Sequence, residues 1–198
     1  MRRETVIALL AVPALAAGCG GGERQDKDET SGNYSVDVVS ASFPTEQRLA
    51  QQEQMVVEVR NADTKTIPNI AVTIDAKDGF TVRSNRTDLA DPNRPVWIVD
   101  DGPVGGGTAY TSTWALGPLK AGETKKFVWK VTPVRSGSHE VKFRVAAGLN
   151  GKAKAQGSGG AAADGSFQVN ISQKPAQATV DPETGKVVES DDDVSDGG

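Results

Sequence analysis

Histidine, cysteine and aromatic residues are scarce in this chain of 198 residues. It contains 1 His and 1 Cys, and aromatic residues make up 5% of it. A lone cysteine excludes an intrachain disulfide, and one His with one Cys excludes a zinc site built from several such side chains. A formal net charge of -4 argues against a general nucleic-acid binder. The composition therefore predicts no metal cofactor and no nucleic-acid partner.

Long apolar runs are also lacking, except at the N-terminus, where two arginines precede the apolar residues 5–18. This run is shorter than the roughly 20 residues that a membrane-spanning helix needs, and it fits the apolar region of a signal peptide. It ends in Leu15-Ala16-Ala17-Gly18-Cys19. Small residues immediately before a cysteine resemble the lipobox of bacterial lipoproteins, although Ala16 stands where a large apolar residue is usual.

The lipobox resemblance implies that residues 1–18 are a signal peptide and that Cys19 is acylated, with fatty acids such as palmitate. Two or more acyl chains anchor a protein stably where a single chain does not. An ordinary secretory signal followed by an unpaired cysteine, or an N-terminal core helix, are the alternatives. We therefore expect a cell-envelope lipoprotein, anchored through its N-terminal lipid to the extracytoplasmic side of the cell membrane.

Polar segments flank the centre of the chain. Residues 20–33 contain no large apolar side chain, and residues 173–198 contain seven acidic and two basic residues. Such compositions bury too little apolar surface to offset the entropy of ordering. We therefore predict a disordered tether over 19–33 and a disordered acidic tail over 173–198.

Apolar and polar residues alternate between these segments with the period of half-buried β-strands. The alternation covers residues 34–38, 55–60, 70–74, 127–132, 141–145 and 167–172, and further strands are expected at 80–82 and 110–116. No stretch after residue 18 has helical periodicity. Seven to eight antiparallel strands over residues 34–172 predict an all-β domain, a β-sandwich rather than a barrel because the strand spacing is irregular.

Two stretches resemble a known group of domains. The sequence Leu116-Gly117-Pro118-Leu119-Lys120-Ala121-Gly122-Glu123 resembles the L-G-x-L-x-x-G-E turn of bacterial surface immunoglobulin-like domains, including the cell-adhesion-related (CARDB-like) group. Residues 55–61 and 67–74 resemble the early strands of that group. The resemblance implies an immunoglobulin-like sandwich outside the cytoplasm. It implies no particular ligand, because these domains serve as adhesion modules, spacers and carbohydrate-binding accessories.

The chain departs from that group in a long polar insertion over residues 83–108, which carries the apolar island 95–99 around Trp97. An aromatic side chain in a polar insertion can bind a sugar or a peptide. Trp97 is therefore a candidate contact for a ligand or for an envelope protein. The alternative is that residues 95–99 fold back and plug the end of the sandwich.

Basic residues gather between positions 115 and 154, where nine of them stand against two acidic residues. If the strands around residues 126–130 and 142–144 pair as a hairpin, their outward side chains form one positive face, made of Lys126, Lys130, Lys142 and Arg144. Such a face would suit a polyanion, either an anionic wall polymer or lipid headgroups. A merely solvated face is the alternative.

Residues for catalysis are few. His139 lies in a turn, and no nucleophile-elbow motif accompanies it. We therefore expect a non-enzymatic binding or structural module. An accessory or assembly subunit of a larger cell-envelope complex is one alternative, and a hydrolase with an unrecognised site is another.

Overall fold

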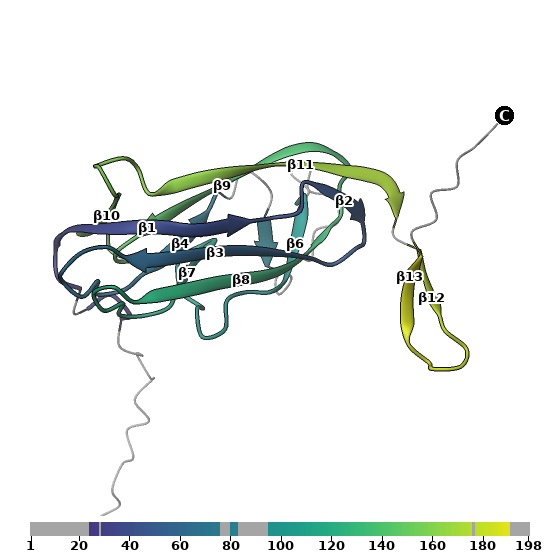
Figure 1. Cartoon of the computed structure of the whole chain (residues 1–198), viewed down its shortest axis with the longest axis horizontal. Coiled ribbons are helices and arrows are strands. Elements are labelled where there is room, and N and C mark those ends of the chain that lie inside the picture. The colour runs from purple at the N-terminus through teal and green to yellow at the C-terminus, as the bar shows by residue number, and fades with distance from the viewer. Residues whose placement is uncertain (1–23, 28, 76–79, 83–94, 176, 191–198) are drawn as a thin grey trace, which may run out of the picture.

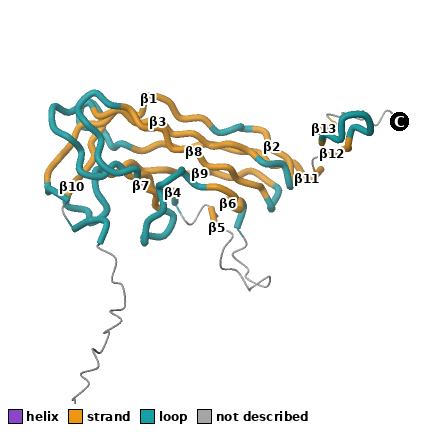
Figure 2. Tube along the Cα trace, turned by 90° about the horizontal axis from the view of Figure 1, so that it is seen from below, coloured by secondary structure: helices purple, strands orange, loops and turns teal. Residues whose placement is uncertain are grey.

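The computed structural model describes residues 24–27, 29–75, 80–82, 95–175 and 177–190 (Figure 1). Strands are the only regular elements in these ranges, and Figure 2 shows the trace as strand and loop throughout. Within the same ranges, no helix is long and apolar enough to cross a membrane. The predicted all-β class is confirmed.

Two sheets stack face to face (Figure 1). The six-stranded sheet, sheet A, has the order β10-β1-β3-β8-β6-β5. Its strands are β10 (Ala153–Gly157), β1 (Gly32–Ser42), β3 (Glu53–Asn61), β8 (Thr124–Pro133), β6 (Trp97–Asp101) and β5 (Phe80–Val82). The five-stranded sheet, sheet B, has the order β2-β11-β9-β4-β7. Its strands are β2 (Glu46–Leu49), β11 (Asp164–Pro175), β9 (Gly137–Ala146), β4 (Ala71–Ile74) and β7 (Thr113–Ala115). The predicted immunoglobulin-like sandwich is confirmed.

Side chains along β3 and β8, the two central strands of sheet A, alternate between the core and the outer face. Met55 and Val57 are fully buried and face Trp129 and Phe127 directly across the ladder. The intervening side chains are half-buried, as Val56 and Val128 are, or exposed, as Lys126 is. A strand directs successive side chains to opposite faces, so this alternation places one row in the core and the other in water.

Aromatic contacts join the two sheets inside the core. Trp114 of sheet B meets Trp129 of sheet A edge to face, with their ring centroids 5.5 Å apart. Trp129 also stacks on Phe127 of its own strand, at a centroid distance of 6.0 Å. Aromatic pairs at such distances stabilise by about 0.5–1.5 kcal/mol beyond the area that they bury. The few aromatic residues of the chain are thus concentrated where the layers meet.

The sandwich has more strands than the seven to eight predicted, and it is not purely antiparallel. β10 pairs with β1, β2 with β11, and β5 with β6 in parallel. β10 falls in a Gly/Ala-rich segment for which the sequence pattern predicts no strand. Its pairing uses the backbone, and its buried side chain, Ala153, is too small to produce a visible apolar alternation.

The C-terminal segment, predicted to be disordered from residue 173, contains strands where the structure describes it. β11 continues to Pro175, and β12 (Gln177–Val180) pairs with β13 (Val187–Ser190) as a hairpin that stands apart from the sandwich in Figures 1 and 2. Its turn is held by Asp181, whose Oδ1 accepts hydrogen bonds from the backbone N–H groups of Glu183, at 2.8 Å, and Thr184, at 3.2 Å. Local turn chemistry therefore orders part of a polar tail, whereas residues 191–198 lie outside the described ranges.

Candidate functional site

The four basic side chains predicted to form one positive face lie on opposite sides of the molecule. Lys126 and Lys130 belong to β8 in sheet A, and Lys142 and Arg144 belong to β9 in sheet B. All four are exposed and point away from the core. The prediction of a single positive face is therefore wrong. It assumed that consecutive strands pair as a hairpin, whereas the short connection between β8 and β9 crosses from one sheet to the other.

Each of these basic residues also has an acidic neighbour. Lys126 stands directly across from Glu58, and Arg144 directly across from Asp164. The Lys130 Nζ lies 3.6 Å from an Asp101 carboxylate oxygen, and the Lys142 Nζ lies 2.9 Å from Glu140. The hydrogen bond from Lys142 lowers the pKa of the Glu140 carboxyl below its ordinary value. Three of these four pairs lie across neighbouring strands, where opposite charges stabilise a sheet, whereas Lys142 and Glu140 stand two residues apart on β9.

Trp97 is fully buried at the end of the sandwich. Its ring lies 5.6 Å from the rings of Phe43 and Phe80, and 5.7 Å from that of His139. Its Nε1–H donates a hydrogen bond of 2.7 Å to Oε1 of the buried Gln47. A side chain enclosed in this way cannot serve as an exposed binding platform. The alternative, proposed for residues 95–99, holds in substance, because Val96, Trp97 and Val99 are buried, although the segment forms strand β6 and is not a loose plug.

His139 has a structural environment rather than a catalytic one. Its ring meets the edge of Trp97, and its Nε2 lies 3.2 Å from the backbone oxygen of Ser136. A Ser-His-Asp triad requires the imidazole to bridge a hydroxyl group and a carboxylate. The contacts of His139 are instead with an indole ring and a main-chain oxygen, so they place it at the edge of the core.

A solvent-open hollow of about 460 Å³ lies on the outer side of sheet B. Charged side chains of both signs and hydroxyl groups line it, among them Thr73, Asp75, Arg144, Asp164 and Ser166. Gly165 helps to shape it, because a Cβ at that position would lie 2.6 Å from the Phe143 ring. This mixed lining suits a small polar group or the side chains of a partner protein.

The N-terminal segment contacts the loop after β9, which the sequence pattern did not predict. The Glu29 carboxylate accepts hydrogen bonds from the backbone N–H of Leu149, at 2.7 and 2.8 Å to its two oxygens, and from that of Asn150, at 3.1 Å. The side-chain amide of Asn69 donates a further bond of 3.2 Å. Residues 24–27 and 29–33 of the predicted tether are thus held against the sandwich. No local sequence pattern predicts this contact, because Glu29 is one acidic residue among several polar ones.

Asp26 extends the same contact. It is 5% exposed, and its carboxylate accepts bonds of 3.0 and 2.7 Å from the Arg24 guanidinium and of 3.3 Å from the Tyr110 hydroxyl. The hydrogen bond from Arg24 lowers the pKa of Asp26 below its ordinary value of 3.8. Gln25 donates a bond of 3.1 Å to the backbone oxygen of Gly107. The N-terminal segment is therefore tied to two different loops.

Cys19, the predicted lipidation site, lies outside the described residues, as does the predicted signal peptide. Acylation therefore stays a prediction. In the part of the chain that the structure covers, no three His, Cys, Asp or Glu side chains gather as ligands for a metal ion.

Comparison with known proteins identifies structural likenesses and no sequence relatives. No protein-family model and no curated protein matches the sequence. The CARDB domain of the PF1109 protein from Pyrococcus furiosus, crystallised in complex with di-metal ions, is 14% identical, with a TM-score of 0.42 over 70% of this chain and 86% of that chain. Native alpha-2-macroglobulin from Escherichia coli, from domain MG7 to the C-terminus, is 11% identical, with a TM-score of 0.42 over 77% of this chain and 21% of that chain.

A β-glucosidase from Listeria innocua, in complex with glucose, is 15% identical, with a TM-score of 0.36 over 71% of this chain and 16% of that chain. CARDB domains are thus among the solved structures that this chain resembles, as the motif over residues 116–123 indicated. At these identities the likeness concerns the fold.

Proposed function

We propose that this chain is an extracytoplasmic lipoprotein, anchored in the cell membrane through Cys19, whose immunoglobulin-like sandwich is a non-enzymatic binding or structural module. The observation that carries the proposal is the apolar leader that ends in small residues and the only cysteine of the chain. The described chain begins five residues after that cysteine, at Arg24, and its next residue, Gln25, already donates a hydrogen bond to the sandwich.

The contacts of the sandwich support a module without chemistry of its own. Trp97 and His139, the side chains considered above as candidates for ligand binding and catalysis, pack against each other at one end of the core. The solvent-open hollow on sheet B favours a binding role over a mere spacer, because a spacer needs no such lining. An accessory subunit of a larger envelope complex, the second candidate, would use this hollow.

Mass spectrometry of the protein purified from membranes tests the anchor. We expect a product that begins at Cys19 and carries acyl chains, and a Cys19→Ser variant that is lost from the membrane fraction. An intact leader without acyl chains would overturn the anchored part of the proposal and leave the fold unaffected.

Photo-crosslinking in intact cells tests the accessory role. A crosslinking side chain at Ser166, in the hollow of sheet B, is compared with one at Lys130, on the outer face of sheet A. Capture of one defined envelope protein from position 166 and not from 130 supports this role. Equal or absent capture at both positions contradicts it.

A further inference from the structure

The N-terminal segment sets how much free chain would separate the sandwich from an anchor at Cys19. If residues 20–31 were all free, they would span up to about 40 Å when extended. Because residues 24–27 and 29–31 lie against the sandwich, only residues 20–23 remain between the cysteine and the first docked residue. Four residues span at most about 14 Å.

We propose that Glu29 clamps this segment to the sandwich and thereby turns one side of the domain, formed by the loops of residues 102–112 and 148–152, toward the surface of the lipid bilayer. The inference rests on the proposed acylation of Cys19. We call the contact of Glu29 with Leu149 and Asn150 the N-terminal clamp.

The geometry of the clamp is specific to a carboxylate. Both oxygens of Glu29 accept backbone N–H groups of the loop after β9, so an amide at this position would present an N–H₂ group to at least one of those donors. Gly148 leaves room for the carboxylate, since a Cβ there would lie 2.6 Å from the Glu29 Oε2. Hydrogen bonds to a charged group contribute more than neutral ones, which favours the docked over the free segment.

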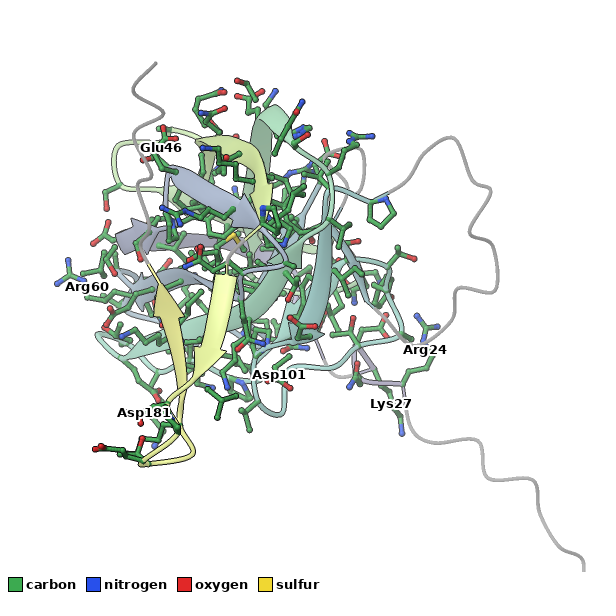
Figure 3. All side chains as sticks on the ribbon, turned by 90° about the vertical axis from the view of Figure 1, so that its right-hand side faces the viewer. Arg24, Lys27, Glu46, Arg60, Asp101 and Asp181 are labelled. Atoms are coloured by element: carbon green, nitrogen blue, oxygen red, sulfur yellow. The ribbon has the colours of Figure 1, made fainter. Side chains whose placement is uncertain are left out.

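The side of the domain that the clamp presents suits a lipid headgroup surface. Val104, in the loop of residues 102–112, is 97% exposed, and Tyr110 of the same loop is 41% exposed. The side chains of Arg24 and Lys27 point outward from this side (Figure 3), and Lys152 is exposed close to them. An exposed apolar tip flanked by basic residues can insert shallowly between headgroups while the charges stay among the phosphates.

Two acidic residues of the described N-terminal segment already have partners. Asp26 is paired with Arg24 and Tyr110, and Glu29 is held in the clamp. Figure 1 shows the described chain starting at the left, whereas β2 and the end of β11 lie at the right-hand end of the sandwich. The side formed by residues 102–112 and 148–152 therefore faces the membrane that holds the anchor. The right-hand end of the sandwich in Figure 1 lies further from that membrane.

Energy transfer to labelled lipid tests this orientation in the acylated protein reconstituted in vesicles. A fluorophore is placed on Val104→Cys or, as a matched exposed valine at the end of β8, on Val134→Cys, which is 44% exposed in the native protein. We expect stronger transfer from position 104 than from 134. We expect this difference to be lost in Glu29→Ala and in Gly148→Ala, and kept in the control Glu183→Ala on the distant hairpin.

Amide hydrogen exchange of the same samples tests the clamp itself. We expect faster exchange at Leu149 and Asn150 in Glu29→Ala than in the control, with the core strands still protected, which shows that the variant is folded. Unchanged exchange at both amides would overturn the clamp. Equal transfer from positions 104 and 134 in vesicle-bound protein would overturn the orientation and leave the anchor intact, whereas failure to carry acyl chains or to bind vesicles would overturn the proposed function.

Discussion

The side chain of Asn61 donates hydrogen bonds of 2.8 Å to the backbone oxygens of Leu119 and Lys65, and so joins the end of β3 to the turn that precedes β8. Asn61 is 1% exposed. Its Oδ1 also accepts the backbone N–H of Asp63 at 2.8 Å. The asparagine that ends the third strand is thus a structural link between two segments that are distant in sequence.

Asn61→Ala is expected to lower the free energy of unfolding by about 1–3 kcal/mol, because it removes the three hydrogen bonds made by this buried side chain. Urea unfolding measures the change. Asn33→Ala, at an exposed position of β1, is the control and should stay within about 0.5 kcal/mol of the native protein. Equal losses in the two variants would contradict the structural role of Asn61.

Trp97→Ala is expected to destabilise the domain by about 3–5 kcal/mol, since it removes a fully buried aromatic side chain and leaves a cavity. Thermal or urea unfolding measures this loss. Val104→Ala, at a side chain that is 97% exposed, should leave the stability in solution within about 0.5 kcal/mol. A Trp97→Ala protein of native stability would mean that this residue lies outside the core.

Gly165→Ala is expected to cost about 1–3 kcal/mol, because the added methyl group overlaps the Phe143 ring, whose Cζ would lie 2.6 Å from it. Phe143→Leu creates space at the same point. In a double-mutant cycle, the Gly165→Ala change should therefore cost less in the Phe143→Leu background than in the native one. Strict additivity would contradict the overlap.

Asp63 is expected to make stability depend on pH. Its carboxylate accepts backbone N–H groups of Ser35, Lys65 and Thr64, and these bonds lower its pKa below the ordinary value of 3.8. The folded protein therefore binds this proton more weakly than the unfolded chain does. The stabilisation is complete well above pH 3.8 and is lost as the pH falls through the lower, folded pKa.

Unfolding of the native protein and of Asp63→Asn between neutral and acidic pH measures this dependence. The variant should be less stable at neutral pH, and the gap should narrow as the medium is acidified. A gap of constant size over the whole range would show that Asp63 does not titrate differently in the two states.

The two pairs of basic residues are expected to act independently. Lys126→Gln with Lys130→Gln alters the outer face of sheet A, and Lys142→Gln with Arg144→Gln alters that of sheet B. Sites on opposite faces share no partners, so the changes in the free energy of unfolding should add to within about 0.5 kcal/mol. A larger coupling would indicate that the four side chains share one face after all.

Strand positions were predictable because the alternation of residues such as Met55, Val57 and Val59 depends only on which face of a strand is buried. The turn around Gly117 and Gly122 was recognisable for a related reason. The φ angles of Gly117 and Gly122 are +74° and +73°, and a residue with a Cβ adopts such angles only at a cost in free energy. Weak local signals led to the errors: Ala153 is too small to show that β10 is a strand, and the Asp181 turn stands in a tail whose overall composition is polar.

The chain's own sequence determined that several segments within residues 34–172 would form half-buried strands around an apolar core, because the period of two and the glycine turns are local properties. Tertiary structure alone decided which strands pair, and with that which side chains share a surface. The crossing from β8 to β9 placed Lys126 and Arg144 on opposite faces, and the fold brought Glu29 to the backbone of Leu149. The physical reason is that pairing and docking depend on contacts between residues far apart in the chain, which no local pattern encodes.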